Sequence, residues 1–386
     1  MTWRECRLGD LIRLQRGHDL PAQDREDGEV PVVSSSGITG YHSTPKAAAP
    51  GVVTGRYGTL GEVFFLDRDY WPLNTALYVT DFKGNDATFT AYFLRNVLKD
   101  YQSDKAAVPG IDRKVLHDLK VRVPGLAEQL RTVAVLSAYD DLIDNNRRRS
   151  KLLEDSARLL FDEWFVNMRF PGHTGTRVDV SLPEGWHTAT LQQLCVANIG
   201  IQTGPFGSQL HQADYSDEGV PVVMPKDLAT MRVSIEMIAR IPEHLANKLG
   251  RHRMQRGDIV FGRRGEIGRR ATIGSRQVGY FCGTGCLRLR PDPALIHPRF
   301  LFAMLGAPAV AGEIANRAKG STMANLSAGA MQTVSVPVPP RSLQDRFAQH
   351  ADDVSEMIDT LDEQSRKLRT ARDLLLPRLM SGQLTV

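Results

Sequence analysis

The sequence contains few cysteines and no long apolar run. Only four of its 386 residues are cysteine, and Cys6, Cys195, Cys282 and Cys286 are scattered apart from one Cys-x-x-x-Cys pair. No further Cys or His cluster stands near that pair to complete a zinc shell, so we predict a buried structural role and no metal. No apolar stretch approaches the ~20 residues of a membrane-spanning helix, and no signal-peptide segment follows the first residues. The expected location is the cytoplasm.

The motifs of several enzyme classes are also missing. The chain has no Gly-x-x-x-x-Gly-Lys-Ser/Thr phosphate loop, which argues against ATP hydrolysis, and no Asn/Asp-Pro-Pro-Tyr segment of adenine methyltransferases. It contains no His-Glu-x-x-His or Gly-x-Ser-x-Gly segment. Glu62, Asp67 and Asp69 lie close in sequence but lack the spacing and the lysine of a two-metal nuclease. These absences predict a binding protein without catalytic residues.

The composition favours a folded protein with a mild basic bias. A length of 386 residues fits two or three domains, and 42% hydrophobic and 24% charged residues are ordinary values. The net charge is +4, and the 48 basic residues are 37 Arg and 11 Lys. Arginine offers a planar fork to phosphate and guanine, which favours nucleic acid as the partner. A GC-rich genome also raises the arginine content, and composition does not separate these explanations.

The sequence does contain an internal repeat. The segment Gly55-Arg56-Tyr57-Gly58-Thr59-Leu60-Gly61 returns as Gly262-Arg263-Arg264-Gly265-Glu266-Ile267-Gly268, and the Val-Pro-Val-Val segment at 30–33 returns at 220–223. The spacing between matched positions increases steadily from the Trp3/Trp186 pair to the Gln129/Gln344 pair. A steady increase indicates insertions in loops between shared elements. A duplicated unit suits a ligand that is itself close to two-fold symmetric.

Each half begins with short β-branched and aromatic runs separated by Gly, Pro, Asn and Asp, which predicts strands. The predicted strands are residues 30–33, 51–54, 62–66 and 76–80 in the first half and 220–223, 258–261, 271–274 and 286–290 in the second. Short helices are predicted at 90–101 and 298–305. Matching last strands at 121–123 and 334–336 are each expected to end at the following proline. The predicted fold class is α+β, with two globular units.

After each proline the pattern changes to a long charged helix, at residues 126–167 and 343–380. Apolar residues recur at heptad spacing from Val354 to Leu375, which predicts a coiled coil. Asn146, Arg149 and Gln364 either form a buried polar layer or lie on solvated flanks, and the pattern does not decide. The first helix would span roughly 63 Å, longer than the ~34 Å of a B-DNA turn. Packed antiparallel with the units at opposite ends, two such helices would act as a ruler.

Loops in both halves carry residue types that contact DNA. In the second half, arginines surround the glycines of the Gly-Arg segment. We attribute the glycines to a tight turn. For the arginines we favour contact with the DNA backbone over a solvated surface without a partner. The candidate contacts of this half are Gln202, Thr203, Phe206, Ser208, Lys226, Arg263, Arg264 and Arg269. The first half has different candidates, Arg16, His18, Ser35, Arg56 and Tyr57. Because the loops differ where the framework repeats, we expect the two units to contact different targets.

The order and duplication of these segments resemble the specificity subunit of type I restriction-modification systems over essentially the whole chain. Residues 200–210 and 220–228 are similar to the opening of a target-recognition domain of that family, and residues 30–42, 55–66 and 70–74 to a different subtype. Residues 128–165 and 374–384 resemble its central and C-terminal spacer helices. By this resemblance Lys226 is a DNA contact. The first half lacks the Thr-Gly-Pro-Phe-Gly-Ser pattern, so contacts of the second half do not transfer to it.

The resemblance implies a non-catalytic subunit with target-recognition domains at 1–125 and 173–340 and spacer helices at 126–172 and 341–386. Each domain would read half of a bipartite DNA site, while the helices would set the gap and dock two adenine-N6 methyltransferase subunits. Motor-nuclease subunits would complete the restriction enzyme, and S-adenosylmethionine, ATP and Mg2+ would belong to these partners. Two alternatives are the recognition subunit of a two-component nuclease-methyltransferase without a motor, and a coiled-coil scaffold that does not bind DNA.

Overall fold

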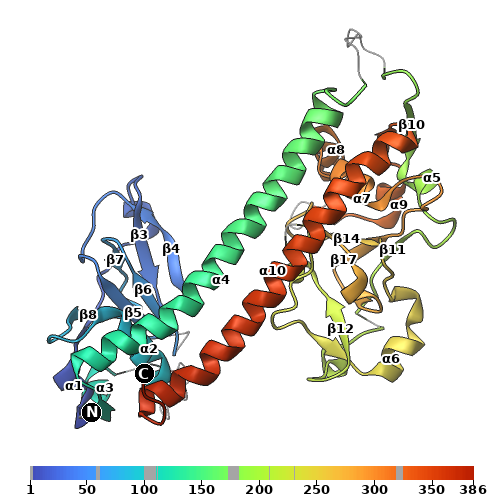
Figure 1. The fold of residues 1–386 in the computed structure, drawn as a ribbon. Helices are drawn as coiled ribbons and strands as arrows, with labels where there is room; N and C mark the ends of the chain where they lie inside the picture. Colours follow the sequence, from blue (N-terminus) through green and yellow to red (C-terminus); the bar gives the residue numbers. More distant parts are fainter. Residues whose placement is uncertain are drawn as a thin grey trace. The chain divides into compact units, whose positions relative to one another are not determined.

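The computed structural model describes residues 3–57, 61–99, 110, 112–172, 182–207, 209–229, 231–318 and 325–386. The chain divides into two compact units, the first made of Met1–Asn146 and Asp362–Val386 and the second of Arg147–Leu361. Each unit contains one globular body of strands and short helices together with parts of both long helices (Figure 1). The α+β class predicted from the sequence is confirmed.

The globular body of the first unit is built on three small sheets. A four-stranded antiparallel sheet has the order β2-β8-β5-β6, with bounds Arg13–Arg16, Ala76–Asp81, Gly51–Gly55 and Val63–Leu66. A three-stranded sheet has the order β4-β3-β7, with bounds Gly37–His42, Val30–Ser34 and Trp71–Pro72, and its β3 and β7 run parallel. β1 (Arg4–Arg7) pairs with β9 (Lys120–Val123). The helices are α1 (Leu8–Leu11), α2 (Ala87–Leu98) and α3 (Arg113–Asp118).

The second unit repeats this plan. Its four-stranded sheet is β11-β17-β14-β15, with bounds Ile201–Thr203, Cys286–Leu289, Ile259–Gly262 and Arg270–Thr272. Its three-stranded sheet is β13-β12-β16, with bounds Arg240–Ile241, Val220–Val223 and Phe281–Cys282, and β12 and β16 run parallel. β10 (His187–Thr190) pairs with β18 (Ser335–Val338). The helices are α5 (Leu191–Leu194), α6 (Glu243–Lys248), α7 (Pro298–Met304), α8 (Pro308–Arg317) and α9 (Ala328–Gln332). The sequence repeat is therefore a repeat of fold.

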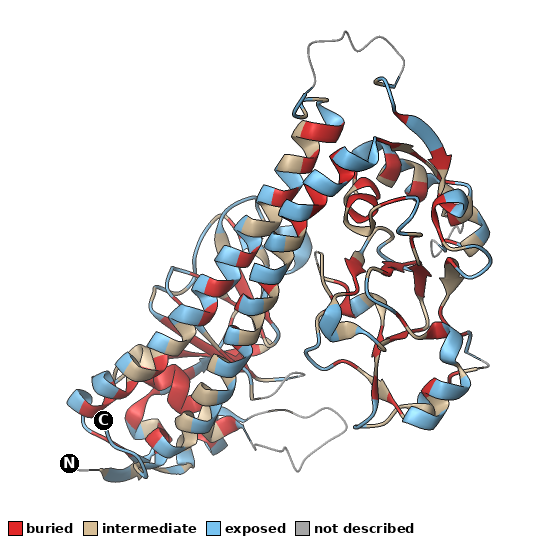
Figure 2. Cartoon of the chain, turned by 45° about the vertical axis from the view of Figure 1, so that its right-hand side comes forward, coloured by how far each residue is buried: buried red, intermediate tan, exposed pale blue. Residues whose placement is uncertain are grey.

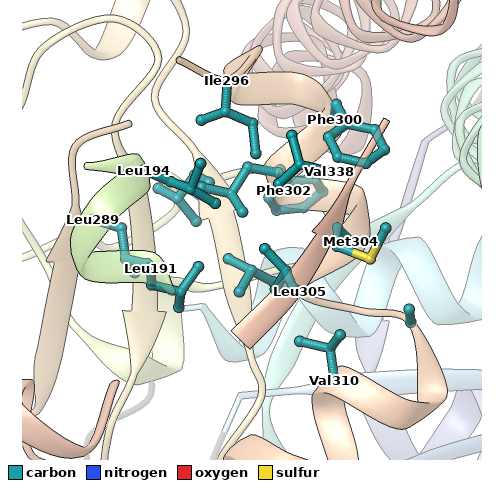
Figure 3. Close-up of a cluster of buried hydrophobic side chains, with 14 of the residues drawn as sticks. Leu191, Leu194, Leu289, Ile296, Phe300, Phe302, Met304, Leu305, Val310 and Val338 are labelled. Carbon is teal, nitrogen blue, oxygen red and sulfur yellow. The ribbon is translucent and has the colours of Figure 1, made fainter. Parts of the chain in front are cut away.

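One apolar core joins the sheet of the second unit to its helices. Figure 3 shows Leu191 and Leu194 of α5 packed with Leu289 of β17 and with Phe300 and Leu305 at α7. Leu191, Leu289, Phe300 and Leu305 have no exposed surface. Burying a side chain of this size contributes about 1.5–3 kcal/mol relative to leaving it exposed. The cluster therefore fixes the orientation of β17.

The two long helices contact each other in both units. They are α4 (Leu126–Phe161), which continues into a π-helical turn at Asp162–Val166, and α10 (Arg341–Ser381). In the first unit Leu136 of α4 shares a core with Leu379 and Met380 of α10. In the second unit Phe161 of α4 lies 5.7 Å from Phe347 of α10, centroid to centroid. Since the start of each helix meets the end of the other, the predicted antiparallel packing is confirmed.

The polar middle of the helices is only partly buried. Figure 2 shows buried positions recurring along both helices. Asn146 is buried, together with Ser150 and Ser365, whereas Arg149 and Gln364 are exposed. Of the three residues that the sequence left undecided, Asn146 is a buried polar residue. Arg149 and Gln364 instead lie on the solvated flanks of the helices.

The predicted strands are present with ends shifted by at most two residues, but one boundary was wrong. Pro337 was expected to end its strand, and it instead lies inside β18, opposite Thr188. A two-stranded sheet leaves one edge of each strand unpaired, so a proline there forfeits no required hydrogen bond. In the first unit β9 does end before Pro124. The predicted helix at 90–101 begins earlier, at Ala87, because the Asp86 side chain accepts a hydrogen bond from Phe89 N at 2.7 Å; residues 100 and 101 lie outside the described residues.

Cys282 and Cys286 lie at the end of β16 and the start of β17, and both are buried as free thiols, which confirms the predicted burial. Burial raises the pKa of Cys282 to about 12, so this thiol is protonated at neutral pH. Within the described ranges, no three His, Cys, Asp or Glu side chains gather in a way that would hold a metal ion. None of the helices described is both long and apolar enough to cross a membrane.

Candidate nucleic-acid interface

Backbone hydrogen bonds gather four loops at one edge of the sheets of the first unit. The loops follow β2, β3 and β5 and connect β7 to β8. Gly17 N donates to Ala76 O at 3.0 Å, and Arg56 N donates to Thr75 O at 2.9 Å. Leu73 N donates to Val33 O at 2.8 Å. Residues 73–76 therefore connect the other three loops.

The second unit repeats these three hydrogen bonds between matching residues. Gly204 N donates to Cys286 O at 3.0 Å, and Arg263 N donates to Gly285 O at 2.9 Å. Gly283 N donates to Val223 O at 2.9 Å. Residues 283–286 thus connect the loops that follow β11, β12 and β14. The framework under the candidate DNA contacts is the same in both units.

Residues 73–76 and 283–286 form the central loop of each cluster, and the loop after β2 or β11 is its first loop. The first loop approaches the central loop so closely that glycine is required in both units. A Cβ atom built on Gly17 would lie 2.1 Å from Leu73 O, and one built on Gly204 would lie 2.0 Å from Gly283 O. Real Cβ atoms are not found this close to a backbone oxygen, so any other residue would push the loops apart. Gly265 and Gly268 have φ angles of +72° and +110°, in agreement with the turn predicted for the second Gly-Arg segment.

Arg263 and Phe206 form the centre of the loop cluster in the second unit. The guanidinium carbon of Arg263 lies 5.8 Å from the centroid of the Phe206 ring, and that residue is 55% exposed. Arg263 itself is buried, and its carbonyl accepts a hydrogen bond from Leu326 N at 2.9 Å. Burial, together with the charge of Arg264, lowers the pKa of Arg263, although a guanidinium stays charged at neutral pH. The ring and the buried backbone thus hold one cation in a defined orientation.

The other predicted residues of this cluster differ in exposure. Arg264 and Lys226 are exposed, and Arg269 is exposed and paired with Glu266. Thr203 is half-buried in β11. The side-chain oxygen of Gln202 accepts a hydrogen bond from Arg288 Nη2 at 3.2 Å, so it already has a partner within the fold. Ser208 lies outside the described residues.

Two arginines, the buried Arg288 and the half-buried Arg290, connect segments next to the cluster. Arg290 makes hydrogen bonds to both carboxylate oxygens of Asp258, at 2.8 and 2.7 Å, and the Asp258 side chain is fully buried. Arg288 is 2% exposed and donates to the carbonyl oxygens of Ile199 and Arg251 as well as to Gln202. These bonds connect β17 to the loop before β11 and to residues 251–253. Such charge-assisted hydrogen bonds are stronger than neutral ones and limit movement of the recognition loops.

The first unit carries different side chains on the same framework. His18 Nε2 lies 3.2 Å from the Tyr78 hydroxyl, and burial and the charge of Lys46 lower the pKa of His18. Arg56 donates to the Tyr57 hydroxyl at 3.1 Å, and its guanidinium carbon lies 4.4 Å from the centroid of that ring, which is 43% exposed. Ser35 is half-buried in the turn between β3 and β4. Arg16, at the end of β2, is exposed and 4.0 Å from the Asp19 carboxylate.

Sequence reasoning missed the central loop of each unit. Asn74 donates through its side-chain amide to the Asp19 carboxylate, and Thr284 donates through its hydroxyl to Pro205 O at 3.1 Å. Asn74 belonged to a segment noted only for its family resemblance. Thr284 lies in the Cys-x-x-x-Cys segment, for which we predicted only a buried structural role. The glycines on both sides of Thr284 were the signal for a loop there.

The model of the type I restriction modification DNA specificity domain matches residues 1–155 and 183–369. The chain belongs to this family. Specificity subunits of this family are non-catalytic and carry no cofactor, since S-adenosylmethionine and ATP are used by partner subunits. The protein is therefore a DNA specificity subunit of a type I restriction-modification system, which removes the scaffold alternative raised from the sequence.

Several specificity subunits are similar to this chain. The type I restriction enzyme MjaIX specificity subunit of Methanocaldococcus jannaschii is 24% identical over 303 residues, which cover 77% of this chain and 68% of that protein. The EcoprrI specificity subunit of Escherichia coli is 24% identical over 157 residues, 39% of each protein. The crystal structure of the type I S subunit from M. genitalium aligns with a TM-score of 0.55 at 16% identity, over 98% of this chain and 96% of that one. This structural likeness shows a common fold.

Proposed function

We propose that each globular body reads one half of a bipartite DNA site through its loop cluster. The observation that carries the proposal is the repeated framework: the same three backbone hydrogen bonds support both clusters, while the side chains above them differ. Backbone geometry positions a protein on the duplex, and side chains at base edges select the sequence. A repeated frame with different side chains suits two domains that read two different half-sites.

In the second domain the cluster combines one buried, oriented cation with exposed ones. Arg263 is oriented by the Phe206 ring and is suited to bidentate contact with guanine. The exposed Arg264, Arg269 and Lys226 are suited to phosphates, and Gln202, Thr203, Phe206 and Ser208 complete the candidate set. In the first domain the candidates are Arg16, His18, Ser35, Arg56 and Tyr57. The stacked Arg56 and Tyr57 pair takes the place of Arg263 and Phe206 there.

Residues 1–125 and 173–340 would be the target-recognition domains, and residues 126–172 and 341–386 the spacer helices that set the unread gap. The helices also offer surface for partners. Exposed leucines occur on α4 in the first unit, at Leu126 and Leu130, and in the second unit, at Leu152 and Leu159. Leu152 and Leu159 are one heptad apart, so they lie on the same face of the helix. Exposed apolar stripes of this kind mark interaction sites, and two methyltransferase subunits would cover them.

In the complex, this chain would direct adenine-N6 methylation by the methyltransferase subunits and, with motor-nuclease subunits, restriction. Methylome sequencing of cells that express the chain with its methyltransferase tests the proposal. We expect one modified bipartite motif with a fixed gap. Modification of a continuous motif, or none, would contradict it. Purification of the complex from its native host distinguishes the two-component alternative, because a partner that combines nuclease and methyltransferase in one chain would then replace the separate subunits.

A further inference from the structure

A groove of about 820 Å³ lies within the second unit, between the second part of α4 and the recognition domain. Lysine or arginine lines it at seven positions, and aspartate or glutamate at three. The basic residues of α4 are Arg147, Lys151 and Arg158, and those of the recognition domain are Arg232, Arg269, Arg270 and Arg299. The recognition-domain wall therefore carries four cations and no carboxylate, whereas the three carboxylates, Glu154, Asp155 and Asp162, all lie on the wall formed by α4 and its continuation.

Each of the three carboxylates that line the groove is paired with an arginine of the lining. Glu154 lies 3.5 Å from Arg232, and Arg158 pairs with Asp155 at 3.4 Å and with Asp162 at 3.6 Å. Arg299 is paired with Asp352 at 2.6 Å, outside the groove lining. Among the described residues no carboxylate lies within ion-pair distance of Arg147, Lys151 or Arg270. The uncompensated charge of the groove thus comes from one helical turn of α4 and from the half-buried Arg270.

Arg270 contributes a charge that the fold itself does not neutralise. Its Nε donates to Phe302 O at 3.1 Å, and its guanidinium carbon lies 4.9 Å from the centroid of the Phe302 ring. Burial lowers the pKa of Arg270 to about 10, so it remains charged at neutral pH. Carbonyl dipoles and a ring face stabilise this cation without cancelling its charge. Its field therefore remains in the groove.

The groove is continuous with the recognition loops. Arg269 and Arg270 end the same turn that begins with Arg263 and Arg264, so the groove starts where the loop cluster ends. On the opposite wall, Arg147 and Lys151 are four residues apart on a helix and so lie side by side on one face. A DNA strand carries one phosphate about every 3.4 Å along the helix axis and can meet several cations in succession.

We infer that this groove holds the phosphate backbone of the DNA that adjoins the half-site of the second domain, through contacts of Arg147 and Lys151 that do not depend on sequence. The inference rests on the proposed function, because it requires the second domain to sit on DNA. It adds a part of α4 to the DNA-binding surface, which sequence reasoning had assigned only to spacing and partner docking.

The double variant Arg147→Ala/Lys151→Ala tests this site in the full-length chain. Binding is measured by fluorescence anisotropy between 50 and 200 mM salt, with a duplex that contains the mapped site and with an unrelated duplex. Loss of two phosphate contacts should reduce the magnitude of the slope of log K against log salt by about 1.8. Between 50 and 200 mM salt, the affinity of the variant should therefore fall by roughly tenfold less than that of the wild type. The loss should be the same for both duplexes. The matched control, Arg148→Ala/Arg149→Ala, removes the same charge from exposed positions of the same helix that do not line the groove, and should leave the slope unchanged.

Three outcomes would overturn the inference or the function beneath it. Equal slope changes in both double variants would mean that only the overall charge of the helix matters, and the groove contact would be wrong. An unchanged slope combined with weaker co-purification of the methyltransferase would assign the groove to an acidic protein segment instead. A wild-type chain without preference for the mapped duplex would contradict the proposed function itself, whatever the variants do. Circular dichroism confirms that all chains retain their helices.

Discussion

Gln129 and Gln344 make the same hydrogen bonds in their respective units. The Gln129 amide donates to Pro124 O at 3.0 Å and accepts from Asp86 N, at the start of α2, at 3.0 Å. The Gln344 amide donates to Pro339 O at 2.9 Å and accepts from His297 N, at the start of α7, at 2.8 Å. Each buried glutamine therefore fastens a long helix to a short helix of its recognition domain. This attachment couples the position of each recognition domain to a long helix.

Gln344→Leu should destabilise the second unit by about 1–3 kcal/mol, because it leaves the part-buried His297 N and the buried Pro339 O without partners. Urea denaturation monitored by circular dichroism measures the loss. Gln364→Leu is the matched control, since Gln364 is exposed on the same helix. Equal stability of the two variants would show that the glutamine is not a structural attachment.

Gly204→Ala should separate the first loop of the second cluster from its central loop. The added methyl group would lie 2.0 Å from Gly283 O, and relief of such overpacking costs about 1–3 kcal/mol. We expect lower affinity for DNA that contains the mapped site and unchanged affinity for unrelated DNA, measured by competition binding. Gly207→Ala, in the same loop but with open space at its Cβ position, should bind like the wild type. Equal losses in both variants would contradict the close contact.

Arg263 and Arg264 are adjacent, but their substitution should affect DNA binding in different ways. Arg263→Lys keeps the charge and loses the planar fork, so it should relax the preference at one base pair by about 1–3 kcal/mol. Arg264→Ala should keep the preference and lower the salt slope by about 0.9, as expected for one phosphate contact. A panel of duplexes with single substitutions in the second half-site, measured at several salt concentrations, gives both quantities. Equal loss of preference in the two variants would contradict the different roles inferred from their burial.

The repeated strands and the long helices could be predicted because their signals are local. Val30 to Val33 and Val220 to Val223 combine β-branched residues with neighbouring turn residues, and the heptads continue over several turns. Short strands such as β7 and β16 were not predicted. They contain two residues each and exist because they pair in parallel with β3 and β12, which lie far away in sequence. Local pattern carries little information about such pairings.

Candidate contacts were harder to predict than strands because their roles depend on distant partners. Gln202 appeared to be a free amide for base contact, but its oxygen accepts a hydrogen bond from Arg288, which is 86 residues away in sequence. Arginine side chains usually lie at the protein surface, whereas Arg288 is nearly fully buried. The arginine cluster at residues 263–270 was recognised from sequence, but its members differ in burial: Arg263 is buried, Arg264 and Arg269 are exposed, and Arg270 is half-buried. Only tertiary packing makes that distinction.

His252 should make the stability of the second unit depend on pH. This side chain is 3% exposed, and burial and the charges of Arg251 and Arg288 lower its pKa to about 4, from the ordinary 6.5. As the pH falls from 6.5 to 4, the unfolded chain binds a proton at His252 that the folded chain does not, so the folded state loses stability. His252→Gln removes this proton-linked loss of stability. As the pH falls from 6.5 to 4, the free energy of unfolding of the variant should rise relative to that of the wild type by on the order of 3 kcal/mol. Urea denaturation at a series of pH values measures the difference, with His244→Gln at an exposed position as the control. A constant difference between wild type and His252→Gln would show that the imidazole is hydrated or charged in the folded protein.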